Sequence, residues 1–147
     1  MQGCPFCFPS DEGLVVRWDH WTVIYNHRPV VDGHCLLVPN SHISTPEQLS
    51  DDDRATFFIA LHRLTIALLP AFNASGYDLA LQIGTSAGQS VEHLHFHCLP
   101  RREADLPPGT SWTDIMGIGG DPDGTTRRTL SSREQTEAAH LVRSRLV

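Results

Sequence analysis

Lysine is absent from the 147-residue sequence, so all 11 basic residues are arginine. Without lysine the chain cannot form a nucleotidyl-lysine adduct, which excludes ligase-type chemistry. The 17 acidic residues outnumber the basic ones and give a formal charge of −6. Because a net-acidic chain is poorly suited to a nucleic-acid backbone or an anionic membrane, we expect neither as a partner. Small phosphorylated ligands remain compatible, since they need only local positive groups.

Long apolar runs are also scarce. No window approaches the roughly 18 apolar residues that a membrane span needs. The first 13 residues lack the basic start and the apolar run of a signal peptide. We therefore expect a cytoplasmic location, where the four cysteines are more often thiols or metal ligands than disulfides. The length suits one compact domain with a single core.

Hydrophobic patterning predicts both strands and helices. Ser50 is a plausible N-cap for a long helix, because acids follow at 51–53 and apolar residues recur at 57, 61, 64 and 68. Pro70 limits the far end of this helix. Residues 105–112 read as a linker, 116–126 as a loop and 131–146 as a short amphipathic helix. The predicted strands are 14–18, 21–26, 35–39, 77–83 and 92–100.

Three histidines alternate in the segment EHLHFHCLPRR, at positions 93, 95 and 97. In a strand, side chains two residues apart share a face, so these imidazoles form a row while Leu94 and Phe96 face the core. A solvated face would more often carry Thr, Lys, Glu or Arg. A single metal ion held by all three imidazoles is the stronger alternative, because imidazole is a common metal ligand.

The segment before this row, GTSAGQS at 84–90, is a loop of small residues. Backbone amides in such a tight turn can surround an anion. A neutral imidazole beside amides that hold a phosphate is suited to nucleophilic attack on phosphorus. The pattern therefore favours a phosphoryl-transfer site over a solvated strand.

A C-x₂-C pair, Cys4-Pro5-Phe6-Cys7, stands near the N-terminus. Alone it is a weak signal, compatible with two reduced thiols, a redox pair or half of a zinc site. A redox motif should open a helix after a strand, which this position disfavours. Zinc would need two further ligands.

The triad segment SAGQSVEHLHFHCLPRR resembles the signature of the histidine triad (HIT) superfamily, His-φ-His-φ-His-φ-φ with φ apolar. The upstream segment NHRPVVDGHCLLVPNSHI is similar to the fragile-histidine-triad branch, the diadenosine-polyphosphate hydrolases. Gln82 stands where that branch has glutamine. The resemblance covers about residues 4–104. It implies an α+β fold in which about five antiparallel strands carry the long helix on one face, and it suggests a homodimer. Residues 1–104 would form the nucleotide-binding catalytic domain, and 105–147 a loop-and-helix extension of it or part of it.

The resemblance also implies roles for individual residues. His95 would attack the α-phosphorus of a dinucleoside polyphosphate or related nucleotide, and water would hydrolyse the nucleotidyl-histidine and release a nucleoside monophosphate. His34 would support the histidine row. The remaining implied contacts are His97 with a phosphate oxygen, Ser90 and Gln89 with the α-phosphate, Gln82 near the scissile bridge, and Asn26 with the ribose.

Some HIT and galactose-1-phosphate uridylyltransferase relatives bind zinc through an N-terminal cysteine knuckle. Matched to their pattern, the ligands here would be Cys4, Cys7, His42 and His93, a closed Cys₂His₂ site and hence structural. The fragile-histidine-triad branch generally lacks the knuckle, so the chain combines features of two branches. Cleavage of a phosphoramidate, as in the Hint branch, and nucleotide binding without turnover therefore stay open as alternatives.

Overall fold

The computed structural model describes residues 3–103, 105 and 127–147. The predicted linker at 105–112 lies outside the described residues apart from Asp105, and the predicted loop at 116–126 lies wholly outside them. The elements in chain order are β1 (Leu14–Arg17), β2 (Trp21–Tyr25), β3 (Cys35–Pro39), the short 3₁₀ turn η1 (Pro46–Gln48), α1 (Asp51–Ala71), β4 (Gly76–Leu81), the 3₁₀ turn η2 (Thr85–Ala87), β5 (Phe96–Arg101) and α3 (Ser132–Arg145).

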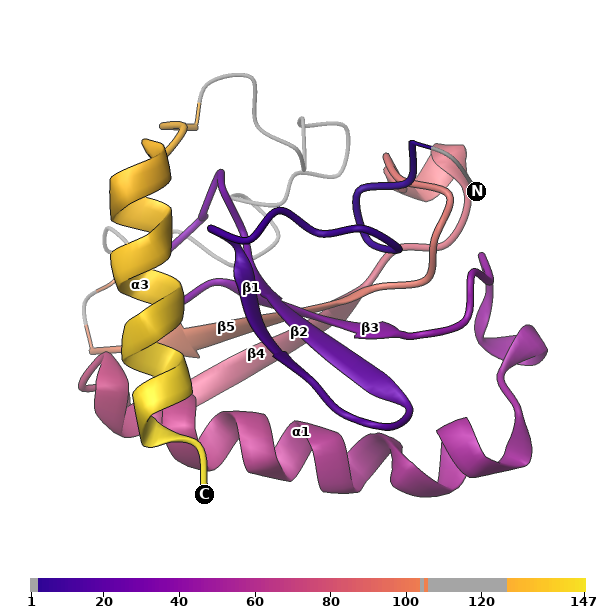
Figure 1. Cartoon of the computed structure of the whole chain (residues 1–147), viewed down its shortest axis with the longest axis horizontal. Coiled ribbons are helices and arrows are strands. Elements are labelled where there is room, and N and C mark those ends of the chain that lie inside the picture. Colours follow the sequence, from indigo (N-terminus) through magenta and orange to yellow (C-terminus); the bar gives the residue numbers. More distant parts are fainter. Residues whose placement is uncertain (1–2, 104, 106–126) are drawn as a thin grey trace.

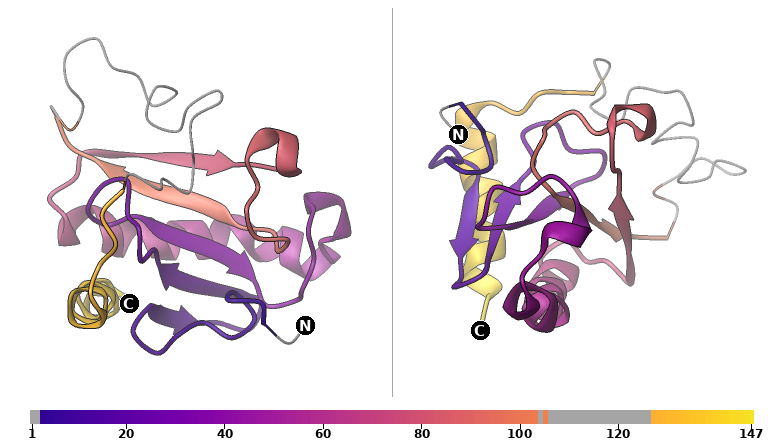
Figure 2. Two further views of the ribbon diagram at one scale, coloured as in Figure 1. Left: turned by 90° about the horizontal axis from the view of Figure 1, so that it is seen from above. Right: turned by 90° about the vertical axis from the view of Figure 1, so that its right-hand side faces the viewer.

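The strands form one antiparallel sheet in the order β1-β2-β3-β5-β4. The long helix α1 lies across one face of this sheet, and the short helix α3 packs beside β1 and one end of α1 (Figures 1 and 2). This arrangement confirms the predicted α+β fold with five antiparallel strands, one long helix and a short C-terminal helix.

The helix α1 begins as the sequence predicts. The Ser50 side chain accepts a hydrogen bond from the backbone N–H of Asp53, and the Asp53 carboxylate accepts one from the Ser50 N–H. Leu61, Leu64 and Leu68 are buried against the sheet, which confirms the predicted core stripe. The helix continues past Pro70 to Ala71.

By length and composition alone, α1 could cross a membrane, contrary to the expectation that no segment would come near this limit. Its buried stripe nevertheless belongs to the same core as the sheet. The opposite side of the helix is apolar too: Phe58 is 73% exposed and Ile59 is 60% exposed. A helix that is apolar on both sides is expected where one side packs on a core and the other meets a further surface.

The second face of the sheet carries a row of paired residues. Leu14 on β1 pairs with Ile24 on β2, Ile24 pairs with Leu36 on β3, and Leu36 pairs with His97 on β5. Directly paired residues of antiparallel strands point to the same side. Ile24 and Leu36 also pack against Phe6 of the N-terminal segment. This row therefore runs from the β1 edge to the histidines on the face opposite α1.

Helix α3 belongs to the same core. Ala139 and Val142 are buried in the cluster that includes α1 and the sheet. The Gln135 side-chain amide donates to the backbone oxygen of Tyr25 at 2.9 Å, and Arg143 Nε donates to that of Val15 at 2.7 Å. The C-terminal helix thus covers the β1–β2 edge of the sheet.

Candidate active site and metal site

A cavity of about 560 Å³ lies over the row of paired residues. Its walls come from the N-terminal segment, the ends of β2 and β3, the segment before β5, and the start of α3. Four of the predicted site residues border it: Asn26, Ser90, His95 and His97. A cavity of this size is typical of a small-molecule site.

The histidine row begins before its strand. The prediction placed a strand over 92–100, whereas β5 starts at Phe96. The segment just before β5 does not pair with β3, because the Leu94 N–H donates to the Ile43 carbonyl and the His93 ring hydrogen-bonds the Pro39 carbonyl. The predicted alternation of side chains is nevertheless present, since Leu94 and Phe96 pack in the core on the α1 side of the sheet.

The ring of His95 is held by the main chain. Its Nδ1 lies 2.7 Å from the carbonyl oxygen of His93, so Nδ1 must carry the hydrogen and donate it. In the neutral ring the lone pair then resides on Nε2. The ring is 4% exposed and borders the cavity. A backbone carbonyl thus fixes the tautomer in which Nε2 is the nucleophilic atom.

His97 is oriented by a chain of hydrogen bonds. The Val30 N–H donates to His34 Nδ1 at 3.1 Å, so the hydrogen of neutral His34 sits on Nε2. That Nε2 lies 2.9 Å from His97 Nδ1 and donates to it. The hydrogen of His97 must then be on Nε2, a buried atom with no hydrogen-bond partner among the described residues. His97 therefore presents an N–H donor beside the cavity.

The pKa values of these two rings keep them neutral. Burial, assisted by the nearby His95, lowers the pKa of His97 from 6.5 to about 3. Burial and the neighbouring His97 lower the pKa of the fully buried His34 well below 6.5. At neutral pH each ring therefore has one donor and one acceptor, as the hydrogen-bond chain requires.

This shift predicts acid sensitivity of the fold. The pKa of His97 is depressed in the folded state, so its stability contribution is full above about pH 6.5 and is lost as pH falls toward 3. Between pH 7 and pH 4 the free energy of unfolding should fall by on the order of 3 kcal/mol from this ring alone. Urea unfolding of the parent and His97→Gln at both pH values measures the effect. The variant should show a shallower decline, and equal declines would contradict the assignment.

The other residues predicted to bind phosphate or ribose do not all lie at the cavity. Asn26 follows β2, and its Oδ1 accepts the Arg28 N–H at 2.9 Å. The Gln89 side chain accepts from the Gly84 N–H at 2.7 Å and donates to the Ser44 carbonyl at 3.2 Å, so it braces the 84–90 loop. Gln82 is half-buried just after β4 and is not among the residues that line the cavity.

Most residues that line the cavity escaped the sequence analysis. Among them are Phe6 and Glu12 on the N-terminal segment, and Leu130, Ser132 and Gln135 at or just before the start of α3. Phe6 stands between the two knuckle cysteines, and its ring centroid is 5.0 Å from that of His95. A phenylalanine inside a C-x₂-C pair was the one available signal for any of them.

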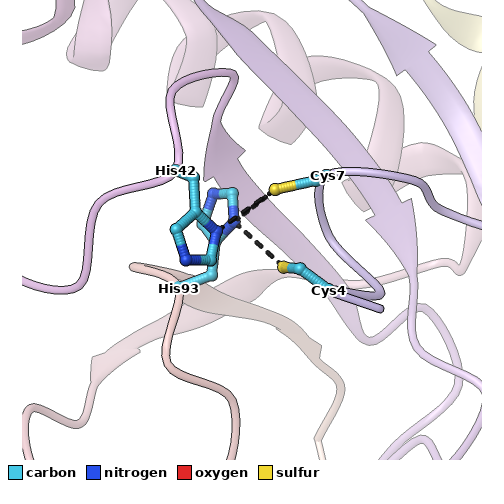
Figure 3. Close-up of side chains that lie close together, drawn as sticks. All are labelled: Cys4, Cys7, His42 and His93. Atoms are coloured by element: carbon cyan, nitrogen blue, oxygen red, sulfur yellow. Dashed lines mark hydrogen bonds between the residues drawn. The ribbon is translucent and has the colours of Figure 1, made fainter. Parts of the chain in front are cut away.

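The four predicted metal ligands converge. Cys4 and Cys7 come from the N-terminal segment, His42 follows β3, and His93 precedes β5 (Figure 3). The candidate ligand atoms of these four residues lie within 4.8 Å of one another. Residues up to 89 positions apart are thus gathered at one point beside the cavity.

The distances fit a tetrahedral ion. A tetrahedral zinc site with Zn–S near 2.3 Å and Zn–N near 2.05 Å places its sulfur and nitrogen atoms about 3.6 Å apart. Here Cys4 Sγ lies 3.4 Å and Cys7 Sγ 3.5 Å from His93 Nδ1, and Cys7 Sγ lies 3.2 Å from His42 Nδ1. His93 Nε2 donates to the Pro39 carbonyl at 2.9 Å, which leaves the Nδ1 lone pair toward the sulfurs.

The same contacts disfavour one ion held by all three imidazoles of the row. His93 Nδ1 faces the cysteines, His95 Nδ1 bonds a carbonyl, and His97 Nδ1 bonds His34. Each ring thus has a different partner, and the row is divided between a candidate metal cluster and a cavity.

The sequence model of the HIT domain family matches residues 9–104, more than half of the chain. The chain belongs to the HIT family. The match ends before α3 and starts after the cysteine knuckle, so these two parts of the site lie outside the HIT domain as matched.

Named relatives share this HIT region. The nitrilase and fragile histidine triad fusion protein NitFhit of Caenorhabditis elegans is 29% identical over 139 residues, which are 95% of this chain and 31% of that protein. The bis(5'-adenosyl)-triphosphatase of Dictyostelium discoideum is 32% identical over 83 residues, 56% of each chain. The chain thus spans about a third to a half of the length of these relatives.

Solved structures agree with the HIT fold. The crystal structure of C. elegans NitFhit superposes with a TM-score of 0.72 at 27% identity, covering 92% of this chain and 27% of that one. A Zn-bound histidine triad family protein of Mycobacterium smegmatis superposes with a TM-score of 0.71 at 23% identity, covering 97% and 91% of the two chains. The latter likeness concerns the fold alone.

Proposed function

We propose that this HIT chain hydrolyses a dinucleoside polyphosphate, or a related nucleotide, through a covalent nucleotidyl intermediate on His95. One observation carries the proposal: the carbonyl of His93 holds the hydrogen of His95 on Nδ1, at the border of a ligand-sized cavity. That contact leaves Nε2 as an unprotonated nucleophile. The relatives named as triphosphatases point to the substrate class.

In the first step His95 Nε2 attacks the α-phosphorus. A P–N bond forms, the P–O bond to the bridging oxygen breaks, and the second nucleotide leaves with the bridging oxygen. Water then attacks the same phosphorus, the P–N bond breaks, and a nucleoside monophosphate is released. The N–H of His97 stabilises the charge that develops on the phosphoryl oxygens, because its position is fixed by His34 before the reaction starts.

The remaining residues bind and orient the nucleotide. Asn26 holds the ribose hydroxyls and Ser90 donates to the α-phosphate, since both border the cavity beside the histidines. Gln89 acts by bracing the loop that carries Ser90. Gln82, which follows β4 outside the lining of the cavity, would contact a phosphate chain that extends beyond the cavity.

We also propose a structural zinc ion on Cys4, Cys7, His42 and His93, supported by their convergence and by the tautomer of His93. An ion bound there would tie the N-terminal segment to β3 and to the segment before β5. Its four protein ligands would leave no open position for substrate, so the ion would contribute stability and no reaction step.

Trapping the intermediate tests the function. The protein is mixed with dinucleoside polyphosphates, adenylylated amines or nucleotide sugars, quenched within one turnover and examined by mass spectrometry. A nucleotidyl mass on the peptide containing His95, with fastest release of product from a dinucleoside polyphosphate, is the expected result. Faster cleavage of adenylylated amines would favour the phosphoramidase alternative. Binding of all substrates without product would favour a binding module.

A homodimer is proposed from an apolar face that spans α1 and β4. On this face Ile59 and Ile66 of α1 and Tyr77, Leu79 and Leu81 of the edge strand β4 are between 39% and 60% exposed, and Phe58 is 73% exposed. The order of the sheet leaves one side of β4 unpaired within the described chain. Exposed apolar edges of this kind are normally covered by a partner.

Leu79→Glu is therefore expected to raise the dimer dissociation constant by on the order of 100-fold, because it places a charge in an apolar contact. Analytical ultracentrifugation across a concentration series measures this. Val147→Glu is the matched control, since Val147 is 89% exposed at the C-terminus. A parent protein that is monomeric at all concentrations, or a Leu79→Glu protein that stays dimeric, would contradict the proposal.

A further inference from the structure

The end of the cavity farthest from the histidines carries a second group of polar side chains. His97 on β5 is three strands away from Leu14 on β1 along the paired row, about 14 Å at a spacing of about 4.8 Å per strand. Glu12, just before β1, and Gln135, on the first turn of α3, border the cavity. In the proposed binding mode, which places the α-phosphate at the histidines, the base would reach toward this end of the cavity.

The backbone at Glu12 is fixed. The N–H groups of Gly13 and Leu14 donate to the Ser10 carbonyl at 3.1 and 3.0 Å, and the Tyr25 N–H donates to the Gly13 carbonyl at 2.7 Å. Glu12 is half-buried, and its carboxylate makes no hydrogen bond or ion pair to the part of the chain that the structure describes. A carboxylate is an acceptor only, with room for two parallel hydrogen bonds.

Gln135 adds a second acceptor close by. Its Nε2 donates to the Tyr25 carbonyl, which assigns the amide and leaves Oε1 as the remaining acceptor. The side chain packs so closely on the Glu12–Leu14 turn that a Cβ at position 13 would lie 2.6 Å from Nε2. Glycine at 13 therefore allows the Gln135 side chain of α3 to pack on the residue that follows Glu12.

We propose that Glu12, assisted by Gln135, makes guanine the preferred base of the bound nucleotide. This rests on the proposed function, because it takes the cavity as a nucleotide site. Guanine presents two adjacent donors, N1–H and the exocyclic N2 amine, which match a carboxylate in a bidentate contact. Adenine presents one amine beside the lone pair of N1, which a carboxylate repels. Uracil offers a single N–H, and cytosine an amine beside a lone pair.

Three mononucleotides separate these contributions. GMP, IMP and AMP share the sugar and phosphate; IMP lacks only the exocyclic N2 amine of GMP. A charge-assisted hydrogen bond corresponds to on the order of tenfold in affinity. Isothermal titration calorimetry on the zinc-loaded protein should therefore give a Kd for GMP on the order of tenfold below that for IMP, with AMP weaker again.

The variant Glu12→Gln should remove most of the GMP preference by raising the Kd for GMP and lowering that for AMP. The amide keeps the size of the side chain, but it presents one acceptor and one donor, a pair that suits the amine and N1 of adenine better than the two donors of guanine. Asp11→Asn is the matched control: it neutralises the exposed neighbouring carboxylate, which does not line the cavity, and should keep the preference. Circular dichroism confirms that each variant is folded.

Equal affinities for GMP and AMP in the parent protein would overturn the base preference and leave the proposed function intact. A preference that persists in Glu12→Gln would overturn the role of Glu12. Failure of all three mononucleotides to bind would overturn the nucleotide site itself, and the base preference with it.

Discussion

Replacing His95 with asparagine is expected to reduce turnover of a dinucleoside polyphosphate by on the order of 10⁴-fold or more. The asparagine amide can still donate to the His93 carbonyl, so the local backbone keeps its anchor. It has no nucleophilic nitrogen, and so no P–N bond can form. Zinc content and mononucleotide affinity should be unchanged, because His95 is not one of the four candidate metal ligands and the other cavity walls remain.

The measurement combines steady-state kinetics with binding and metal analysis. His62→Asn is the matched control, since His62 is exposed on α1 and the same substitution there should change none of the three quantities. A His95→Asn protein that retains turnover within tenfold of the parent would contradict the covalent mechanism. Loss of metal from His95→Asn would instead favour the alternative in which all three imidazoles of the row hold one metal ion.

The elements of the fold could be predicted where local patterns determine them. The Ser50 cap and the spacing of Leu61, Leu64 and Leu68 are encoded within one segment, and the helix forms as expected. The start of β5 could not be predicted in this way. His93 and Leu94 look like strand residues, but their contacts with Pro39, the last residue of β3, and with Ile43, which follows β3, draw them away from the sheet.

The residues of the site also fall into two groups, those that belong to a local sequence motif and those that only tertiary packing brings to the site. The four residues of the candidate metal cluster could be predicted from the resemblance to zinc-binding relatives, because a C-x₂-C pair and a histidine triad are compact motifs that can be matched in sequence. The wall formed by α3 could not, because the contact of Gln135 with Tyr25 joins residues 110 positions apart and depends on how the helix packs. A role for Glu12 could not be predicted from the sequence either, because it depends on the end of the cavity at which the strand pairing places this residue.

The knuckle also connects the candidate metal cluster to the ring of His95. Phe6 lies between the two cysteines, and its ring packs edge-on against both His93 and His95, with centroid distances of 5.9 and 5.0 Å. Phe6 in addition packs on Ile24 and Leu36 under the cavity. A change in the metal ligands is therefore expected to act on nucleotide binding as well as on stability.

His42→Ala is expected to reduce zinc from about one ion per chain to a small fraction, because three ligands hold a structural ion poorly. If zinc is about 1,000-fold above its Kd in the parent, its loss removes about 4 kcal/mol, a fall in Tm of roughly 10 °C. His42 is exposed, so little packing is lost with its ring. The Kd for mononucleotides should rise, since Phe6 is no longer held. Zinc analysis, thermal unfolding and calorimetry measure these three effects.

Cys35→Ala, which changes a buried thiol outside the cluster, should retain zinc in full. Full zinc occupancy in His42→Ala or in His93→Ala would show that these four residues are not the ligands.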